Sequence, residues 1–239
     1  MMAPSLLSFH LVFAVISAVA LGATLNTELA GLAILVLLLG WNAAFASFYQ
    51  DTELYRMWRW SALISVFQVI PDWFLASVLK TIKFTHFPYV PRVGGEVPIY
   101  MAFMWTMPLV WLLSAFRQPP GRLRSLMSPL PAASLGELVM AGMIALITFG
   151  AAELIMGGSG ADFPLTLWTA AVKRRVCGHV AAYVLPAEAA LGAAALVDYR
   201  STAEHGKVQL ALMAAAVSTF YAGALSISFL LIEFEEPTP

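Results

Sequence analysis

Seven long apolar segments constrain this chain more than any other feature, because they leave little polar surface to face water. A helix needs about 20 mostly apolar residues to cross the hydrocarbon core of a bilayer. Charged residues make up 11% of the 239 residues and hydrophobic residues 60%, whereas soluble domains carry roughly 25% charged residues. The sequence therefore predicts an all-α, polytopic membrane helical bundle with about seven transmembrane helices, in one integral-membrane domain over residues 1–239. The predicted spans are 5–24, 28–49, 58–79, 98–116, 134–155, 177–198 and 208–232.

The charge pattern narrows the cellular setting and the partners. A net charge of −1 gives no case for nucleic acid. No Lys or Arg precedes the first apolar segment, so we expect a retained span rather than a signal peptide. We expect a multi-pass protein of the cell's inner or plasma membrane, with membrane lipids and an apolar, lipid-like substrate as partners. Basic residues divide almost evenly between the two sides, so the sequence gives no orientation, and it leaves the oligomeric state open.

Three further patterns bear on the packing of the spans. Small residues are dense in "HVAAYVLPAEAALGAAAL", which favours close contact between helices. Ser134 and Glu137 match a capping box at the start of the fifth span, so we expect Glu137 to cap that helix. The sequence shows no internal repeat strong enough to identify.

Titratable side chains within or beside the spans are the candidates for a functional site, because a charge at the centre of a span costs about 2.5–3.5 kcal/mol. We name the membrane side of the N-terminus side A and the opposite side side B. With alternating span directions, five such groups from four spans fall in the half nearest side B. They predict a polar pocket that opens towards side B. The five residues are Asp72, Glu96, Glu153, His179 and Glu188.

A carboxyl group buried in apolar surroundings resists ionisation and can act as a general acid. We therefore expect the four carboxyl groups of the pocket to be acid or base groups. Tyr183 follows His179 by four residues, on the same helix face, and either side chain would orient a reacting group or relay a proton. The predicted catalytic set is Asp72, Glu96, Glu153, Glu188, His179 and Tyr183.

Aromatic rings near the carboxyl groups offer faces that stabilise a cation. Polar amides in the same spans would add hydrogen bonds to a substrate. The predicted substrate-binding residues are Trp41, Asn42, Gln68, Trp73 and Trp105.

Each candidate also has a purely structural explanation. A carboxylate is favourable at a helix N-terminus, so Glu96 can be a helix-start residue. His179 and Glu153 can face the interface, and Asp72 can bond to backbone near a proline. Glu188, near the middle of its span, is the hardest to explain in this way.

The chain resembles the small integral-membrane terpenoid cyclases of fungi and bacteria, and the membrane carotenoid cyclases and hydratases. The resemblance is one of architecture over most of the chain: seven spans, few charges and scattered intramembrane Asp and Glu. The stretches "VIPDWF", "GGEVPIYMAFMW" and "HVAAYVLPAEAALG" look like family motifs, but no catalytic residue is carried over from them. The resemblance implies acid-triggered cyclisation, isomerisation or hydration of a lipid-soluble isoprenoid, without a metal or other cofactor.

Other functions stay open at this point. Glu96, Glu153, His179 and Glu188 form an alternative metal-binding set. A non-catalytic protein that binds or transports an ion, a proton or a small ligand is a second alternative, and a subunit of a membrane complex is a third. A retinal protein is excluded because the last span has no lysine after Lys207. Motifs for phosphate binding, serine hydrolysis and zinc proteolysis are absent from the sequence.

Overall fold

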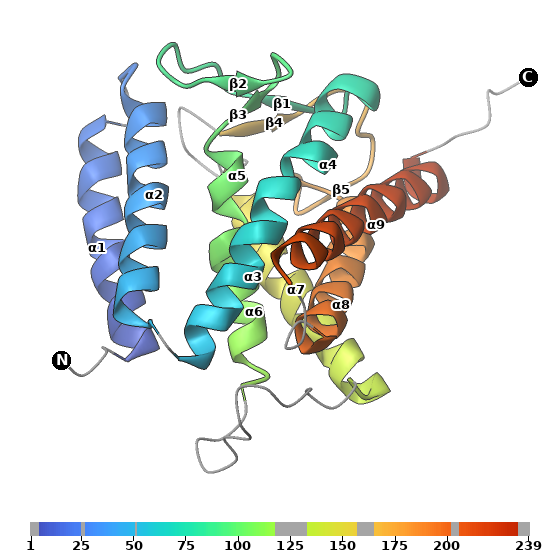
Figure 1. Ribbon diagram of the computed structural model, residues 1–239. Coiled ribbons are helices and arrows are strands. Elements are labelled where there is room, and N and C mark those ends of the chain that lie inside the picture. Colours follow the sequence, from blue (N-terminus) through green and yellow to red (C-terminus); the bar gives the residue numbers. More distant parts are fainter. Residues whose placement is uncertain are drawn as a thin grey trace, which may run out of the picture.

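The computed structural model describes residues 5–24, 27–50, 52–117, 133–156, 165–201 and 206–233. These residues form an all-α membrane helical bundle with a few short strands gathered at one end (Figure 1). This confirms the fold class expected from the sequence. The helices are α1 (Leu6–Thr24), α2 (Ala30–Phe48), α3 (Glu53–Phe67), α4 (Val69–Trp73), the π-helical turn η1 (Phe74–Val78), α5 (Met101–Met104), α6 (Thr106–Ser114), α7 (Leu135–Met156), α8 (Val184–Ser201) and α9 (Lys207–Glu233).

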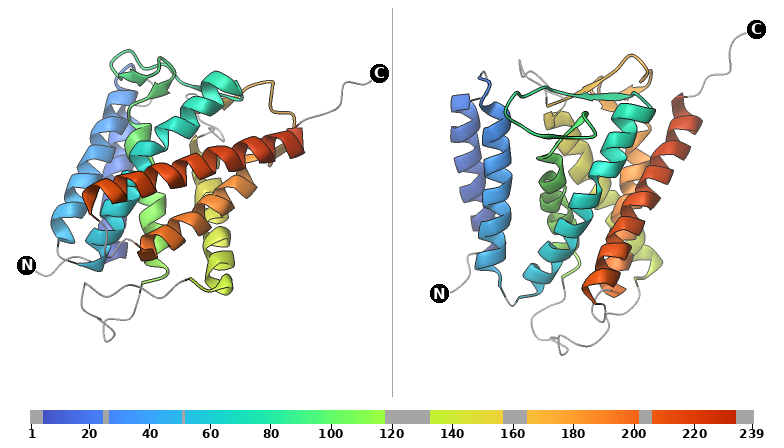
Figure 2. Two further views of the ribbon diagram at one scale, coloured as in Figure 1. Left: turned by 45° about the vertical axis from the view of Figure 1, so that its right-hand side comes forward. Right: turned by 45° about the horizontal axis from the view of Figure 1, so that its top comes forward.

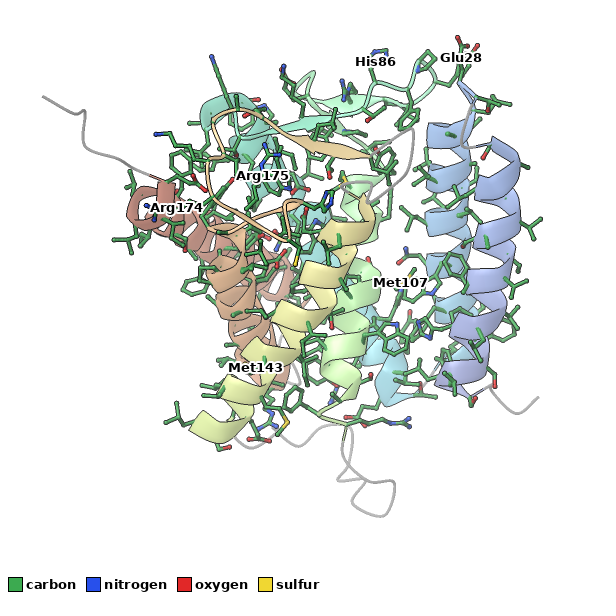
Figure 3. All side chains as sticks on the ribbon, turned by 180° about the vertical axis from the view of Figure 1, so that it is seen from behind. Glu28, His86, Met107, Met143, Arg174 and Arg175 are labelled. Atoms are coloured by element: carbon green, nitrogen blue, oxygen red, sulfur yellow. The ribbon has the colours of Figure 1, made fainter. Side chains whose placement is uncertain are left out.

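Five of the helices are long and apolar enough to cross a membrane. They are α1, α2, the continuous rod α3–α4–η1, α7 and α9. Their outward side chains are hydrocarbon, as lipid requires: Val19 is 70% exposed and Leu231 77% exposed. Figure 3 shows the polar side chains of Glu28, His86, Arg174 and Arg175 at the end of the bundle that carries the strands, and Met107 and Met143 within its body.

The expected fourth and sixth spans begin later than the sequence predicted. Helix α5 begins at Met101 rather than 98, and α8 begins at Val184 rather than 177. The residues before each helix form a β-hairpin, so their backbone groups bond to one another instead of entering a helix. Hydropathy does not distinguish a hairpin from the start of a helix here, because both hairpins end in apolar residues. Met101–Ser114 is a shorter apolar segment, and α8 carries Glu188, Asp198 and Arg200.

The strands form three two-stranded antiparallel sheets. Two are the hairpins β2–β3 and β5–β6, and the third joins β1 to β4, with Lys83 opposite Leu167. All of them lie at the side-B end of the bundle (Figures 1 and 2). The strands are β1 (Ile82–Phe84), β2 (Arg92–Val93), β3 (Val97–Pro98), β4 (Thr166–Trp168), β5 (Arg175–Val176) and β6 (Val180–Ala181).

The two hairpins are copies of one another in sequence and in backbone conformation. Residues 92–100 read "RVGGEVPIY" and residues 175–183 read "RVCGHVAAY". In each, the two central residues adopt positive φ: 59° and 77° at Gly94 and Gly95, 52° and 74° at Cys177 and Gly178. Consecutive positive φ angles define the type I′ turn that favours tight hairpins. The tyrosine that ends each copy is buried.

The resemblance extends to the elements on either side of each hairpin. A helix rises from side A to side B, a short strand and the hairpin follow, and a second helix returns to side A. We call residues 53–114 the first unit and residues 135–201 the second unit. Strands β1 and β4, the same element in each unit, pair antiparallel. The chain therefore contains an internal duplication, and our expectation of no identifiable repeat was wrong.

An arginine fixes each hairpin in the same way. The Nη2 of Arg92 donates to the carbonyl oxygens of Phe84 and Thr85, at 2.9 and 3.5 Å. The Nη2 of Arg175 donates to those of Trp168 and Thr169, at 3.1 and 3.0 Å. A guanidinium supplies several donors in a fixed plane, so one side chain can bond two successive carbonyls.

The side-A end is closed by charged and polar contacts. Ser134 N donates to Glu137 Oε2 at 2.8 Å and Glu137 N donates to Ser134 Oγ at 3.3 Å, which confirms the expected capping box. The guanidinium of Arg200 donates to both oxygens of Glu137, at 3.0 Å to Oε2. The start of α7 is thus bonded to the end of α8.

Helices α7 and α8 approach one another closely at Gly192. A Cβ at this position would lie 2.8 Å from the carbonyl oxygen of Ala141 and would also meet the Ala145 side chain. This contact agrees with the close packing that the small residues predicted.

We predict that Gly192→Ala destabilises the protein by about 1–3 kcal/mol, because the added methyl group forces the two helices apart. Gly223→Ala is the matched control: Gly223 is an exposed helical glycine with open space around it, so alanine should be neutral or slightly stabilising. Thermal unfolding of both variants in detergent checks this. Equal melting temperatures for the two variants would contradict the close approach.

Candidate functional site

Asp72 lies in the helical turn α4, at the point where the first rising helix changes from α-helix to a π-helical turn. Its side chain is buried, at 5% exposure. The indole Nε1 of Trp105 donates to Asp72 Oδ2 at 3.4 Å. The Tyr221 ring of α9 lies 6.0 Å from the Trp105 ring, between centroids. The first unit and α9 therefore enclose this carboxyl group.

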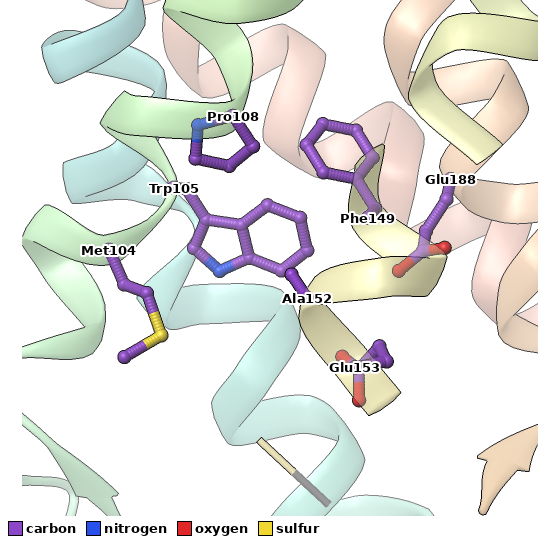
Figure 4. A pocket seen from close by; sticks show the side chains of 7 residues that line it. All are labelled: Met104, Trp105, Pro108, Phe149, Ala152, Glu153 and Glu188. Atoms are coloured by element: carbon purple, nitrogen blue, oxygen red, sulfur yellow. The ribbon is translucent and has the colours of Figure 1, made fainter. Parts of the chain in front are cut away.

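Glu153 on α7 and Glu188 on α8 face one small cavity (Figure 4). Glu188 has no exposed surface and Glu153 is 6% exposed. The cavity has a volume of about 20 Å³, enough for one water molecule. The residues around it are Met104, Trp105, Pro108, Phe149, Ala152, Glu153 and Glu188.

Trp105 contacts both Asp72 and the cavity of Glu153 and Glu188. Its N–H bonds Asp72, and its ring lies against the cavity that Glu153 and Glu188 share. The Phe149 ring packs edge-on against it at 5.1 Å between centroids. Three of the four carboxyl groups predicted for the pocket are thus brought together, from α4, α7 and α8.

The duplication explains why these residues meet. Trp105 is the fifth residue after Tyr100, and Glu188 is the fifth residue after Tyr183, so the two occupy the same place in the two units. Asp72 and Glu153 each lie near the end of a rising helix. Each unit therefore supplies one carboxyl from its rising helix and one partner from its returning helix. The partner is a hydrogen-bond donor in the first unit and a second carboxyl in the second.

The carboxyl groups of the second unit are poorly satisfied. Within the described part of the chain, neither oxygen of Glu188 has a hydrogen-bond partner, and Oε2 of Glu153 has none. Burying a polar group without a hydrogen bond costs about 1–3 kcal/mol. An apolar side chain at either position would pack equally well without this cost. A role for these oxygens in binding or chemistry is therefore the natural explanation.

Glu96 and His179 do not reach this site. Both are exposed and hold the same position in the two hairpin turns. Their backbone N–H groups close the turns, donating to Val93 O at 3.2 Å and to Val176 O at 3.1 Å. The expectation that Glu96 starts the fourth span and His179 opens the sixth was wrong, because each precedes its helix by several residues and points away from the bundle.

Tyr183 is buried one turn before Glu188. Its hydroxyl donates to Thr81 Oγ1 at 2.7 Å, so it joins the second unit to the first. Its ring packs edge-on against Phe229 of α9. The bond to Thr81 gives Tyr183 a position above the carboxyl groups rather than a contact with the cavity.

The predicted aromatic and amide residues divide among three places. Gln68 is fully buried, one turn before Asp72, and Trp105 lines the cavity. Trp73 is 39% exposed and packs against the hairpin at Gly94. Trp41 and Asn42 belong to a separate aromatic cluster between α1 and α2.

That cluster accounts for both α2 residues. Trp41 stacks on Phe45 at 5.0 Å between ring centroids. The Asn42 amide donates to Leu38 O at 2.8 Å and accepts from the indole of Trp58 at 3.0 Å. Both residues thus have structural contacts away from the carboxyl groups.

Sequence reasoning missed Phe149 and Tyr221, which both pack edge-on against Trp105. Phe149 stands four residues before Glu153, on the same face of α7, and this spacing was a usable signal. Tyr221 gave none, because an aromatic residue inside an apolar span reads as ordinary packing.

Among the described residues, no three His, Cys, Asp or Glu side chains are placed to hold a metal ion. The alternative set of Glu96, Glu153, His179 and Glu188 is not assembled, because two of its members lie in the exposed hairpin turns.

The geometry defines a class: a helical membrane protein with a duplicated unit and a buried carboxyl site between the copies. The chain belongs to the DUF6989 family, described as a domain of unknown function, whose family model matches residues 69–232. The matched region holds the carboxyl residues, both hairpins and most of α9. No curated protein and no solved structure matches the chain.

We predict that Asp72 and Trp105 stabilise the fold through one another. Trp105→Phe removes the N–H donor and Asp72→Asn changes the acceptor, so the effects of the two substitutions should not add. We expect a coupling free energy of about 0.5–3 kcal/mol in a double-mutant cycle. Unfolding in detergent measures it, and strictly additive effects would contradict the hydrogen bond.

Proposed function

We propose that the protein is an intramembrane enzyme that acts on a lipid-soluble isoprenoid by general-acid chemistry. The observation that carries the proposal is the pair Glu153 and Glu188, buried at one cavity with the Trp105 and Phe149 rings. A carboxylic acid beside aromatic faces provides both a proton and a stabilising surface for the cation that the proton creates.

In the proposed step, the O–H bond of a carboxylic acid at the Glu153–Glu188 pair breaks. A C–H bond forms at one carbon of a substrate double bond, and the other carbon becomes a carbocation. The Trp105 and Phe149 rings line the cavity with the two carboxyl groups (Figure 4), and in this proposal they stabilise the cation. The cation then has three outcomes, and in each one a proton returns to the carboxylate. It closes a ring and the new cation loses a proton (cyclisation), it adds water and the oxonium loses a proton (hydration), or it loses a proton from a neighbouring carbon (isomerisation).

The surroundings of the cavity suit a substrate that arrives from the lipid. Met104, Pro108 and Ala152 are partly exposed, between the first returning helix and α7. The cavity itself accepts only a water-sized group. We therefore propose that the reacting end of the isoprenoid enters as the flexible Met104 side chain moves, and that the remaining chain lies in hydrocarbon between these helices.

We also propose seven membrane crossings in the cell's inner or plasma membrane. The rods α3–α4–η1, α5–α6, α7 and α8 would cross in the two units, with α1, α2 and α9 beside them. Five of these segments are long and apolar enough by themselves. The α5–α6 and α8 segments would cross with their ends completed by the hairpins.

A second candidate function is coupled transport of a proton or another cation. The duplication favours it, because parallel repeats with a site at their interface are a recurring transporter architecture. The same carboxyl groups would then bind the ion, and Glu188→Gln would abolish ion flux in liposomes.

We predict that Glu188→Gln, Glu153→Gln and Asp72→Asn each reduce product formation by about 10²-fold or more, because each removes an acid or base group. The test is untargeted lipid mass spectrometry of a host that makes squalene, carotenoids and prenylated quinones, with and without the protein.

Glu96→Gln is the matched control for these variants. It makes the same chemical change at an exposed turn of the same unit, so it should leave the product unchanged. An isoprenoid profile that responds to the protein but not to any of the three buried carboxyl substitutions would rule out the acid site.

A further inference from the structure

A polar stripe runs along α3 towards Asp72. Ser61, Ser65 and Gln68 are spaced four and three residues apart, so they share one face of the helix, and Asp72 continues the stripe four residues later. The first three have no exposed surface. Helix α3 packs against α5, α6 and α9. The stripe therefore lies inside the bundle and spans about 16 Å from Ser61 to Asp72.

The polar atoms of the stripe have no hydrogen-bond partner among the described residues. This holds for the hydroxyls of Ser61 and Ser65 and for both amide atoms of Gln68. Several other helical hydroxyls bond the carbonyl four residues earlier. Ser47 does so with Ala43 O and Ser226 with Ala222 O, both at 2.8 Å. The stripe hydroxyls do not make this bond.

Two more unpartnered hydroxyls lie on the helices that pack against α3. Thr106 follows Trp105 on the returning helix, and Ser218 lies one turn before Tyr221 on α9. Both are buried and neither hydroxyl has a partner within the described chain. Trp105 and Tyr221 lie next to one another beside Asp72. Ser218 therefore lies about one turn nearer side A than this point, and Thr106 one residue nearer.

The second unit shows that the fold does not require polar residues here. Below Glu153, the corresponding rising helix α7 buries Ala141, Ala145 and Phe149, which are all apolar. The same architectural position is therefore sealed in one unit and polar in the other. Unpartnered polar groups inside a membrane bundle are costly, so the polar version calls for a ligand that bonds them.

We propose that the seam formed by Ser61, Ser65, Gln68, Thr106 and Ser218 binds a file of water molecules that ends at Asp72 and exchanges protons with the acid site. Buried water typically makes about three hydrogen bonds to such otherwise unsatisfied groups. The hydroxyls and the amide each offer donors and acceptors, as a proton-conducting file needs. The proton-exchange role rests on the proposed acid chemistry, whereas the water file itself does not.

Cysteine accessibility tests the water file directly, because a thiol reacts with a hydrophilic methanethiosulfonate only where water allows the thiolate to form. Cys177, the single native cysteine, is first replaced by serine. Ser61→Cys and Ser65→Cys are then labelled in membranes. Ile64→Cys, on a packed face, and Val66→Cys, on an exposed face of the same turn, are the controls.

We expect labelling at positions 61 and 65 to be at least about tenfold faster than at 64 and 66. Equal rates at 64, 65 and 66 would overturn the proposal. Serine and cysteine are close in size, so folding should be preserved. Gln68 stays unchanged in all of these variants.

The proton-exchange role is tested by the Ser61→Ala, Ser65→Ala double variant, which should lower the Glu188-dependent product about tenfold. Ser47→Ala, which removes a hydroxyl already bonded to backbone, is the control. Labelling at position 65 without any Glu188-dependent product would retain the water file and reject the acid enzyme. A Glu188-dependent product with position 65 unlabelled would reject the water file alone.

Discussion

The antiparallel pairing of β1 with β4 is the interaction on which the arrangement of the two units depends. Its ladder places Ile82 opposite Trp168, and it continues beyond the strands, where Thr169 N donates to Thr81 O at 2.8 Å and Thr85 N to Leu165 O at 3.1 Å. The strand of each unit thereby satisfies the backbone of the other, so neither unit has a complete side-B end alone. The helices below follow this pairing, and the carboxyl groups meet between them.

Within this shared frame the two units have diverged in chemistry rather than in shape. Both keep the arginine, the turn and the buried tyrosine, which hold the hairpin over the bundle. The position five residues further on is Trp105 in one and Glu188 in the other. A duplicated frame can accept such changes because its backbone bonds are made at the hairpin, away from the positions that differ. The site is therefore asymmetric although its scaffold is not.

The sequence predicted the parts of the structure that local chemistry determines. Apolar length gave the helical bundle, the Ser134–Glu137 spacing gave the cap of α7, and dense small residues gave the close contact at Gly192. Membrane depth also brought Asp72, Glu153 and Glu188 to one half of the bundle. Membrane depth alone does not say whether these side chains point toward one another. Their orientation depends on how the two units pair.

The hairpins escaped prediction for a physical reason. The hairpins are stabilised by hydrogen bonds from Arg92 and Arg175 to backbone carbonyls at the ends of the preceding strands. Hydropathy does not predict such bonds. Glu96 and His179 were therefore assigned to helix starts. The duplication was hidden because the clear identity between the units is confined to the hairpins, while the helices need only remain apolar. Trp41 and Asn42 were assigned to the site because of their residue types, although they belong to the aromatic cluster between α1 and α2.

The partly exposed edge of the cavity at Met104, Pro108 and Ala152 has a consequence for how occupancy is measured. A ligand that enters there partitions first into the bilayer, so the quantity that governs binding is its mole fraction in lipid and not its concentration in water. Adding detergent micelles dilutes that ligand in the phase where it meets the protein. The same amounts of protein and ligand would then give different apparent affinities in dilute and in concentrated detergent, with no change in the protein itself.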